Sequence, residues 1–169
     1  ILIASVFLVW LYRKSQVPQM FRIEGKTMGT TYHVTYFDKN GRNFKNSVDS
    51  LLGVVNKSIN NYDPTSEVSR FNKSEAGIAF GLPYLYYPVK RAEEIFSASK
   101  GAFDPTVMPL VNAWGFGPGK QINPDSIQID SIRAFVGFLK IRLERDSLIK
   151  LDPRVQLDFG GIGQGYGAD

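Results

Sequence analysis

Hydrophobic and polar positions repeat with two different periods along this chain of 169 residues. Residues 30–38, TTYHVTYFD, alternate between large apolar or aromatic side chains and small polar ones, which predicts a half-buried strand. Residues 44–61 carry apolar side chains at helical spacing, which predicts an amphipathic helix. The single His, His33, falls among threonines on the polar face of the strand. We therefore expect it to be solvated and not catalytic.

Shorter patterns predict the elements that follow. Ser66 is a candidate N-cap for a short helical turn over residues 67–71. Apolar positions from Val89 to Phe96 predict a second helix, which Gly101 ends. Asp130 is the candidate cap of a third helix, whose inward positions would be Ile132, Phe135 and Val136.

The rest of the chain predicts strands, a helix and one irregular stretch. Residues 138–152 read as two strands around a turn, and residues 155–159 read as a further strand. A helix is expected from Ile162 onward. Residues 101–117 are apolar but broken by prolines and glycines, so we expect an irregular binding wall there. Strands and helices mix without a regular βαβ repeat, which indicates the α+β class.

The N-terminal residues 1–14, ILIASVFLVWLYRK, form an apolar run that ends in two cations. A membrane-spanning helix takes roughly 20 residues, so the run by itself is too short. No small-x-small cleavage site follows it, which favours a retained membrane anchor over the remnant of a signal peptide. A buried strand is the alternative. Residues 15–24 then read as a linker into a domain that spans residues 25–169.

Composition narrows the classes of function. Hydrophobic residues make up 43% of the chain and charged residues 21%, as in a globular protein. The net charge of +4 is scattered and forms no basic stripe, so we expect no nucleic-acid partner. The absence of Cys excludes thiol catalysis, disulfides and Cys-based zinc sites. A single His also argues against a Ser-His-Asp triad.

The densest glycine run, LDFGGIGQGYGAD at residues 157–169, joins a predicted strand to a predicted helix. This arrangement is typical of phosphate sites, because glycines admit a close ligand and a helix start offers free N–H groups. A dinucleotide fingerprint starting at Gly161 would need Gly where Tyr166 stands, and a P-loop starting at Gly160 would need Lys there. A structural turn and a phosphate site therefore both remain open.

Three other stretches carry candidate chemistry. GKTMGT, residues 25–30, places Met28 between glycines, either to fill the core or to lie against a flat aromatic ligand. YDPTSEVSRFN, residues 62–72, reads on its own as turn and cap chemistry, and the third stretch is the irregular wall at 101–117. In order and spacing, these three and the glycine run resemble the ApbE family, the FAD:protein FMN transferases, from about Phe21 to Asp169.

The resemblance implies an α+β flavin-transferase fold, incomplete at the C-terminus, and a magnesium-dependent enzyme. Such an enzyme cleaves the pyrophosphate of FAD, passes FMN to a Thr or Ser of an acceptor protein and releases AMP. Some members instead hydrolyse FAD to FMN and AMP. Two further possibilities are a flavin-binding module without catalysis and an anchored domain without a small ligand.

The resemblance also assigns site residues. Cofactor contacts fall on Met28, Tyr62, Ala102, Phe103, Asp104, Asp158 and Gln164, and a metal-binding backbone carbonyl falls on Gly161. No residue is assigned as catalytic. The family usually has Lys where this chain has Gln164, which can donate a hydrogen bond but carries no charge.

Family members continue beyond the position of Asp169, and that later part supplies the acidic and Thr ligands of magnesium. We therefore expect this chain to be an N-terminal fragment that is inactive alone. Members act at the outer face of bacterial membranes, often as anchored proteins, and known acceptors include subunits of membrane redox pumps. The resemblance thus implies an envelope protein facing the periplasm or exterior, with residues 1–14 in the membrane.

Overall fold

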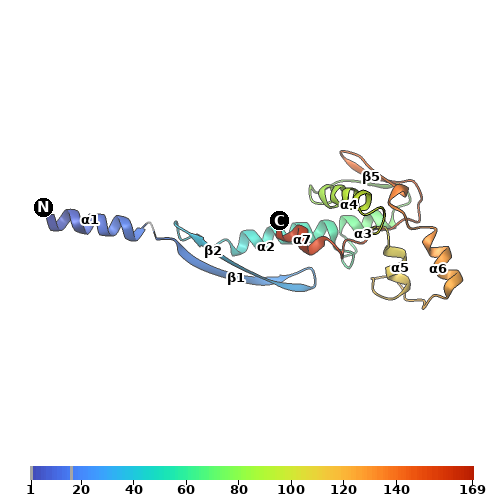
Figure 1. Cartoon of the computed structure of the whole chain (residues 1–169), viewed down its shortest axis with the longest axis horizontal. Helices are drawn as coiled ribbons and strands as arrows, with labels where there is room; N and C mark the ends of the chain where they lie inside the picture. Colours follow the sequence, from blue (N-terminus) through green and yellow to red (C-terminus); the bar gives the residue numbers. More distant parts are fainter. Residues whose placement is uncertain (1, 16) are drawn as a thin grey trace. The chain divides into compact units, whose positions relative to one another are not determined.

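The computed structural model describes residues 2–15 and 17–169 and divides into two compact units, Ile1–Leu52 and Gly53–Asp169 (Figure 1). The first unit holds α1 (Leu2–Ser15), β1 (Gln19–Thr27), β2 (Thr30–Asp38) and the start of α2 (Lys45–Ile59). The second holds the end of α2, then α3 (Glu67–Lys73), β3 (Gly77–Ala79), α4 (Tyr86–Ala98), α5 (Met108–Ala113), α6 (Ser126–Arg133), η1 (Phe138–Lys140), β4 (Ile141–Leu143), β5 (Ser147–Lys150) and α7 (Gly163–Ala168). The border at Leu52 falls inside the range expected as one domain, residues 25–169.

A long antiparallel hairpin dominates the first unit. β1 pairs with β2 from Gln19↔Asp38 to Thr27↔Thr30, so two residues form the loop. Met28 (φ 49°) and Gly29 (φ 74°) both take left-handed backbone conformations, as a two-residue hairpin turn requires. The strand predicted over residues 30–38 is confirmed, whereas the stretch expected as a linker enters β1 at Gln19.

Cross-strand packing explains one glycine of the hairpin. Gly25 lies opposite Tyr32, and a Cβ at Gly25 would come within 2.5 Å of the tyrosine ring. Gly25 therefore makes room for an aromatic side chain whose hydroxyl donates a hydrogen bond to Asp49 of α2. His33 is exposed, with 63% of its side chain accessible to solvent, as its place on the polar face predicted.

The apolar N-terminal run forms α1, a helix of 14 residues. Its accessible side chains include Phe7 and Trp10, whose rings stack with centroids 5.9 Å apart. Across the described parts of the chain, every helix is too short or too polar to cross a membrane.

The core of the second unit is formed by α3, α4, the three-stranded sheet and the segment before the glycine run. Its fully buried side chains are Val68, Phe71, Leu85, Val89, Ala92, Leu148, Val155 and Leu157. The sheet has the order β3-β5-β4, and both pairings are antiparallel. The two strands predicted within residues 138–152 are therefore confirmed as β4 and β5, and helix and sheet mix as expected for the α+β class.

Local capping chemistry decides where α3 and α6 begin. Ser66 caps α3 as predicted, because its Oγ accepts a hydrogen bond from the backbone N of Ser69 at 3.1 Å. The prediction that Asp130 caps the next helix is wrong, since Asp130 lies inside α6. Asp125 caps α6 instead, and Gln128, three positions later, completes a capping box.

The prediction of an irregular stretch over residues 101–117 is also wrong in part, because α5 lies within it. Pro109 falls in the first turn of α5, where its missing N–H leaves no intrahelical bond unmade. α5 and α6 lie next to each other in the second unit (Figure 1).

Residues 155–159 do not form the predicted strand. Their only bridge to another segment within the described parts is the parallel one between Gln156 and Val107. Their alternation is nevertheless real, since Val155, Leu157 and Phe159 are all buried. Side-chain amides supply the hydrogen bonds that a neighbouring strand would otherwise make. The helix expected from Ile162 onward is confirmed as α7, with Ile162 as its N-cap.

Candidate functional site

Three of the four motif stretches meet at the segment that leads into the glycine run. The backbone N of Asp158 donates to the carbonyl of Pro105 at 2.7 Å, which ties the glycine run to the stretch 101–117. On the preceding residue, the carbonyl of Leu157 accepts from Nδ2 of Asn61 at 2.6 Å. Asn61 directly precedes Tyr62, so the predicted ligands Tyr62, Asp104 and Asp158 each belong to this junction or lie next to one of its residues.

Asp158 presents a partly free carboxylate. Its side chain is half-buried, and Oδ1 accepts from the backbone N of Gly160 at 3.0 Å. A Cβ at Gly160 would lie 3.3 Å from the same oxygen, so a glycine there lets the carboxylate fold back onto the chain without crowding. Oδ2 accepts no hydrogen bond from the described residues, and it is therefore available to a ligand.

Gly161 and Phe103 lie against each other. A Cβ at Gly161 would be in ordinary contact, 3.5 Å, with the ring of Phe103. No backbone N–H of the described residues donates to the Gly161 carbonyl oxygen, and Gly161 is exposed. A free, accessible carbonyl oxygen is a hard ligand of the kind that Mg²⁺ accepts. Two predicted site residues that lie far apart in sequence are thus brought together.

Asp104 is fully occupied as a structural cross-link. Its Oδ1 accepts from the backbone N and the Oγ1 of Thr106, at 2.8 and 2.6 Å. Its Oδ2 accepts from the backbone N of Phe138 at 3.1 Å, and Thr106 Oγ1 accepts from the N of Gly137 at 2.7 Å. Within the triplet, Ala102 is exposed and Phe103 half-buried. The Asp104 carboxylate therefore holds the loop in shape, which leaves the neighbouring Ala102 and Phe103 to meet a ligand.

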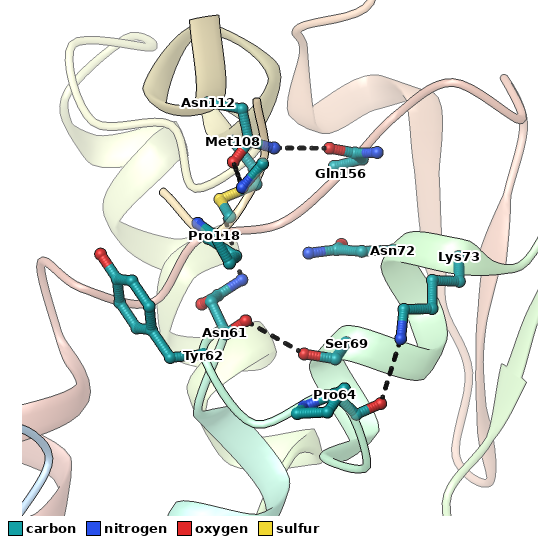
Figure 2. A pocket seen from close by; sticks show the side chains of 11 residues that line it. Asn61, Tyr62, Pro64, Ser69, Asn72, Lys73, Met108, Asn112, Pro118 and Gln156 are labelled. Carbon is teal, nitrogen blue, oxygen red and sulfur yellow. Dashed lines mark hydrogen bonds between the residues drawn. The ribbon is translucent and has the colours of Figure 1, made fainter. Parts of the chain in front are cut away.

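Tyr62 stands at the rim of a cavity of about 310 Å³. Its side chain is exposed, and its hydroxyl donates to the carbonyl of Phe116 at 2.6 Å. Figure 2 shows Asn72 and Lys73 on one side of the hollow and Asn61 and Pro118 on the other. The lining consists of Asn61, Tyr62, Pro64, Ser69, Asn72, Lys73, Met108, Asn112, Pro118, Gly119 and Gln156.

The cavity wall is rich in amide side chains, and its charge is positive. Lys73 is the charged residue of the lining, and its Nζ donates to the carbonyl of Pro64 at 3.3 Å. Nδ2 of Asn112 donates to Oε1 of Gln156 at 3.3 Å, which leaves the Gln156 amide nitrogen free to donate elsewhere. A hollow with an aromatic rim, apolar prolines and polar edges suits a flat heteroaromatic ligand.

The remaining predicted ligands, Gln164 and Met28, belong to elements other than the segments that form this junction. Gln164 is exposed on α7, two residues after the N-cap Ile162. Met28 belongs to the first unit, at the tip of the β1–β2 hairpin, whereas all the other candidates belong to the second unit. The assignments of these residues to FAD, and of Gly161 to a metal, stay predictions. In the described residues no three His, Cys, Asp or Glu side chains are grouped as a metal site would need.

Two residues that hold the site were missed by sequence reasoning, namely Asn61 and Asn72. The stretch 62–72 suggested turn and cap chemistry, and that interpretation is correct for Ser66. Nothing in the local pattern indicates that an asparagine at the end of this stretch reaches Leu157, 85 residues later. Only the strand-like alternation of residues 155–159, with no partner strand in the sequence, hints that such donors are needed.

Comparison with known proteins agrees with the resemblance read from the four motifs. The sequence model of the ApbE family matches residues 28–169. A relative from Vibrio cholerae, named FAD:protein FMN transferase, is 32% identical over 99% of this chain and 52% of its own length. One of the same name from Haemophilus influenzae is 34% identical over 89% of this chain and 47% of its own length.

Solved structures share the fold. The flavin transferase ApbE from Vibrio cholerae superposes with a TM-score of 0.81 at 32% identity, covering 89% of this chain and 51% of its own. The apo form of the Pseudomonas stutzeri flavinyl transferase ApbE gives 0.79 at 34% identity, with 89% and 50% covered. The chain spans about half the length of the curated relatives it matches. The family match, the sequence identities and the shared fold together establish that this chain belongs to the ApbE family.

Proposed function

We propose that the protein is an FAD:protein FMN transferase. In this reaction the hydroxyl oxygen of an acceptor Thr or Ser attacks the phosphorus of the FMN half of FAD. The phosphoanhydride bond breaks, AMP leaves with the bridging oxygen, and the hydroxyl proton passes to a base or to solvent. The product is a protein carrying FMN through a phosphoester bond.

The observation that carries this proposal is the junction around Leu157 and Asp158. It gathers the exposed aromatic ring of Tyr62, the Phe103–Gly161 contact and a carboxylate with one free oxygen into one part of the second unit. The cavity beside Tyr62 would receive a flat part of FAD. Asp158 would accept hydrogen bonds from the ribityl chain, ribose or ring edge of the cofactor, because an ionised carboxylate only accepts.

Magnesium fits what Gly161 offers, although this carbonyl supplies a single ligand. Mg²⁺ prefers octahedral oxygen coordination and is commonly shared between carboxylates and substrate phosphates. The other ligands are expected in the part of the family sequence that this chain does not cover. When bound, the metal would neutralise charge on the pyrophosphate. Gly161 would contribute its carbonyl oxygen, and Phe103 would shield one side of that oxygen from solvent.

Two alternatives rest on specific features of the same site. If water takes the place of the acceptor hydroxyl, the products are FMN and AMP, and the protein is an FAD pyrophosphatase. Gln164 favours a third possibility, a flavin-binding module without turnover, because a neutral amide stabilises pyrophosphate oxygens less than a Lys ammonium would.

We also propose a setting and a partner. The partner is an acceptor protein with a flavinylated Thr or Ser, such as a subunit of a membrane redox pump. The exposed apolar side chains of α1, among them Val6, Phe7 and Trp10, support attachment of the N-terminal segment to a membrane. The domain would then face the periplasm or the exterior of a bacterial cell.

Acceptor labelling separates the transferase from the pyrophosphatase and the binding module. The protein, expressed at its full encoded length, is incubated with FAD, Mg²⁺ and a candidate acceptor subunit, and the acceptor is weighed by mass spectrometry. A transferase adds the mass of FMN less one water to the acceptor. Free FMN with an unlabelled acceptor would indicate a pyrophosphatase, and tight FAD binding with neither product would indicate a binding module.

A further inference from the structure

Two asparagine side chains form hydrogen bonds with the backbone of residues 157–159, in the place where a neighbouring strand would otherwise bind. Nδ2 of Asn72 donates to the carbonyl of Leu157 at 2.9 Å, and its Oδ1 accepts from the N of Leu157 at 2.7 Å. Nδ2 of Asn61 donates to the same carbonyl at 2.6 Å, and its Oδ1 accepts from the N of Phe159 at 3.4 Å. The two amides therefore satisfy both backbone groups of Leu157 and one of Phe159.

Further hydrogen bonds hold the backbone of both asparagines. The backbone carbonyl of Asn61 accepts from Ser69 Oγ at 3.3 Å, and the backbone carbonyl of Asn72 accepts from Lys150 Nζ at 3.4 Å. Ser69 and Lys150 are buried. Asn72 also lies near the end of α3, whose N-cap Ser66 is fully buried. Asn72 thus ties the bonded segment to α3, and Asn61 ties it to the loop between α2 and α3.

The bonded segment is directly continuous with the predicted ligands. Asp158 lies between Leu157 and Phe159, the two residues whose backbone the amides bind, and Gly161 follows shortly after. Leu157 and Phe159 are buried, with 0% and 2% of their surface exposed, so their side chains anchor the segment in the core on both sides of Asp158. A small backbone shift at Leu157 would therefore move the Asp158 carboxylate and the Gly161 carbonyl together.

We propose that Asn61 and Asn72 are positioning residues for FAD: they set the Asp158 carboxylate and the Gly161 carbonyl at the places where cofactor and metal meet them. This inference rests on the proposed function. Neither asparagine is required to touch FAD. Their effect is to keep a short, strandless segment in the one backbone conformation that presents both oxygens.

An Asn→Asp substitution tests this role with little change in shape. The new carboxylate keeps an acceptor for the backbone N–H, but its second oxygen faces the Leu157 carbonyl and repels it. Protonation of the carboxyl restores a donor at that place. Burial and the facing Leu157 carbonyl raise the pKa of such an Asp, whereas Lys150, whose Nζ donates to the Asn72 backbone carbonyl at 3.4 Å, and Lys73 oppose that rise at position 72. The defect should therefore shrink as the pH falls, and more strongly in Asn61→Asp than in Asn72→Asp.

The experiment compares Asn72→Asp and Asn61→Asp with Asn43→Asp in the protein at its full encoded length. Asn43 is the control, because its Oδ1 also accepts a hydrogen bond from a backbone N–H, that of Lys45 at 2.9 Å, while the side chain is exposed and lies outside the cavity lining. FAD affinity is measured at pH 8 and pH 5 by flavin fluorescence. Hydrogen exchange of residues 157–161 is followed by mass spectrometry without FAD.

We expect the Asn61 and Asn72 variants to lose about tenfold or more in FAD affinity at pH 8. At pH 5 the loss should fall to about threefold, and exchange in residues 157–161 should be faster than in the unsubstituted protein. Asn43→Asp should change affinity less than about threefold. Two positioning variants are used so that poor folding of one does not decide the result.

Several outcomes would overturn the inference. Unchanged affinity in both positioning variants would show that the segment tolerates the loss of its amides. An equal loss in Asn43→Asp would show a general effect of the added negative charge. Lower melting temperatures with unchanged FAD affinity would show that Asn61 and Asn72 have only a structural role. Failure of the unsubstituted protein to bind FAD would contradict the proposed function together with this inference, and is thereby distinguished from the others.

Discussion

At the scale of single residues, two aspartates near the glycine run differ in how many of their carboxylate oxygens are already hydrogen-bonded. Asp152 binds Arg154 through both oxygens, with Arg154 Nε at 2.9 Å and its Nη2 at 2.7 Å. Hydrogen bonds from Arg154 hold the pKa of Asp152 well below its usual range. Among the described residues, the Asp158 carboxylate accepts one hydrogen bond, from the backbone N–H of Gly160. One carboxylate is thus committed to local structure, and the other keeps an oxygen for a ligand.

Asp158→Asn should weaken FAD binding by about tenfold or more, because a charge-assisted hydrogen bond becomes a neutral one. The fold should persist, since the Asn oxygen can still accept from Gly160. Asp152→Asn serves as the control: it should lower stability through the lost Arg154 pair while leaving affinity nearly unchanged. Titration of FAD against both variants measures the difference. Equal losses of affinity would argue against a ligand contact at Asp158.

Gln164→Lys should raise FAD turnover in the protein at its full encoded length without changing the fold. A cation near the start of α7 is opposed by the helix dipole, at a cost of roughly 0.3–1 kcal/mol. Attraction to the doubly charged pyrophosphate should exceed that cost. Steady-state AMP release measures the effect. Lower turnover with unchanged FAD binding would mean that the site is tuned to a neutral side chain at this position.

At the scale of elements, β5 places a cation inside the second unit. Lys150 is 7% exposed, lies 4.9 Å from the centroid of the Phe71 ring and donates to the carbonyl of Pro153 at 3.1 Å. Burial lowers the pKa of Lys150 to about 8. Between that value and the ordinary pKa of 10.5, the unfolded chain holds more protons on this amine than the folded chain does.

The contribution of Lys150 to the free energy of unfolding should therefore increase with pH. Below pH 8 both states are charged there and the full burial penalty applies; above it the folded amine loses its proton first. Relative to Lys150→Met, the wild-type free energy of unfolding should rise between about pH 8 and 10. Urea denaturation at several pH values measures this, with the exposed Lys57→Met as a control for net charge. Parallel curves for wild type and Lys150→Met would contradict it.

Two glycines in different elements should respond oppositely to alanine. Gly53 lies in the interior of α2 with open space around its Cβ position, so Gly53→Ala should stabilise by about 0.5–1 kcal/mol. Gly77 in β3 has φ +119°, and a Cβ there would lie 2.1 Å from the carbonyl oxygen of Leu148. Gly77→Ala should destabilise by about 2 kcal/mol or more. Thermal unfolding tests the pair, and a neutral Gly77→Ala would refute the close approach.

Elements encoded by local patterns could be predicted from the sequence, and those set by distant partners could not. Alternation predicted β2, helical spacing predicted α2, and the Ser66 cap marked the start of α3. The cap of α6 was misassigned to Asp130 because two acids precede apolar positions, and only Asp125 has Gln128 at capping-box spacing. Residues 155–159 alternate like a strand, yet the amides that complete them come from the region of α2 and α3, far away in sequence.

At the scale of the whole molecule, the family and the candidate ligands followed from four motifs in register, whereas their assembly did not. The sequence placed Tyr62, Asp104 and Asp158 in one site only through the resemblance. Contacts such as Asp158 N to Pro105 O, and the Asp104 link to Phe138, depend on tertiary packing that no local pattern encodes.

The central claim is that this protein binds FAD and cleaves its pyrophosphate with a divalent metal. The most direct test is AMP release from FAD by the protein at its full encoded length, followed by chromatography with Mg²⁺ and with excess EDTA. We predict AMP release with Mg²⁺, and its loss when EDTA removes the metal or when Asp158 is replaced by Asn. Equal AMP release in Mg²⁺ and in EDTA, or no release with any divalent metal, would contradict the claim.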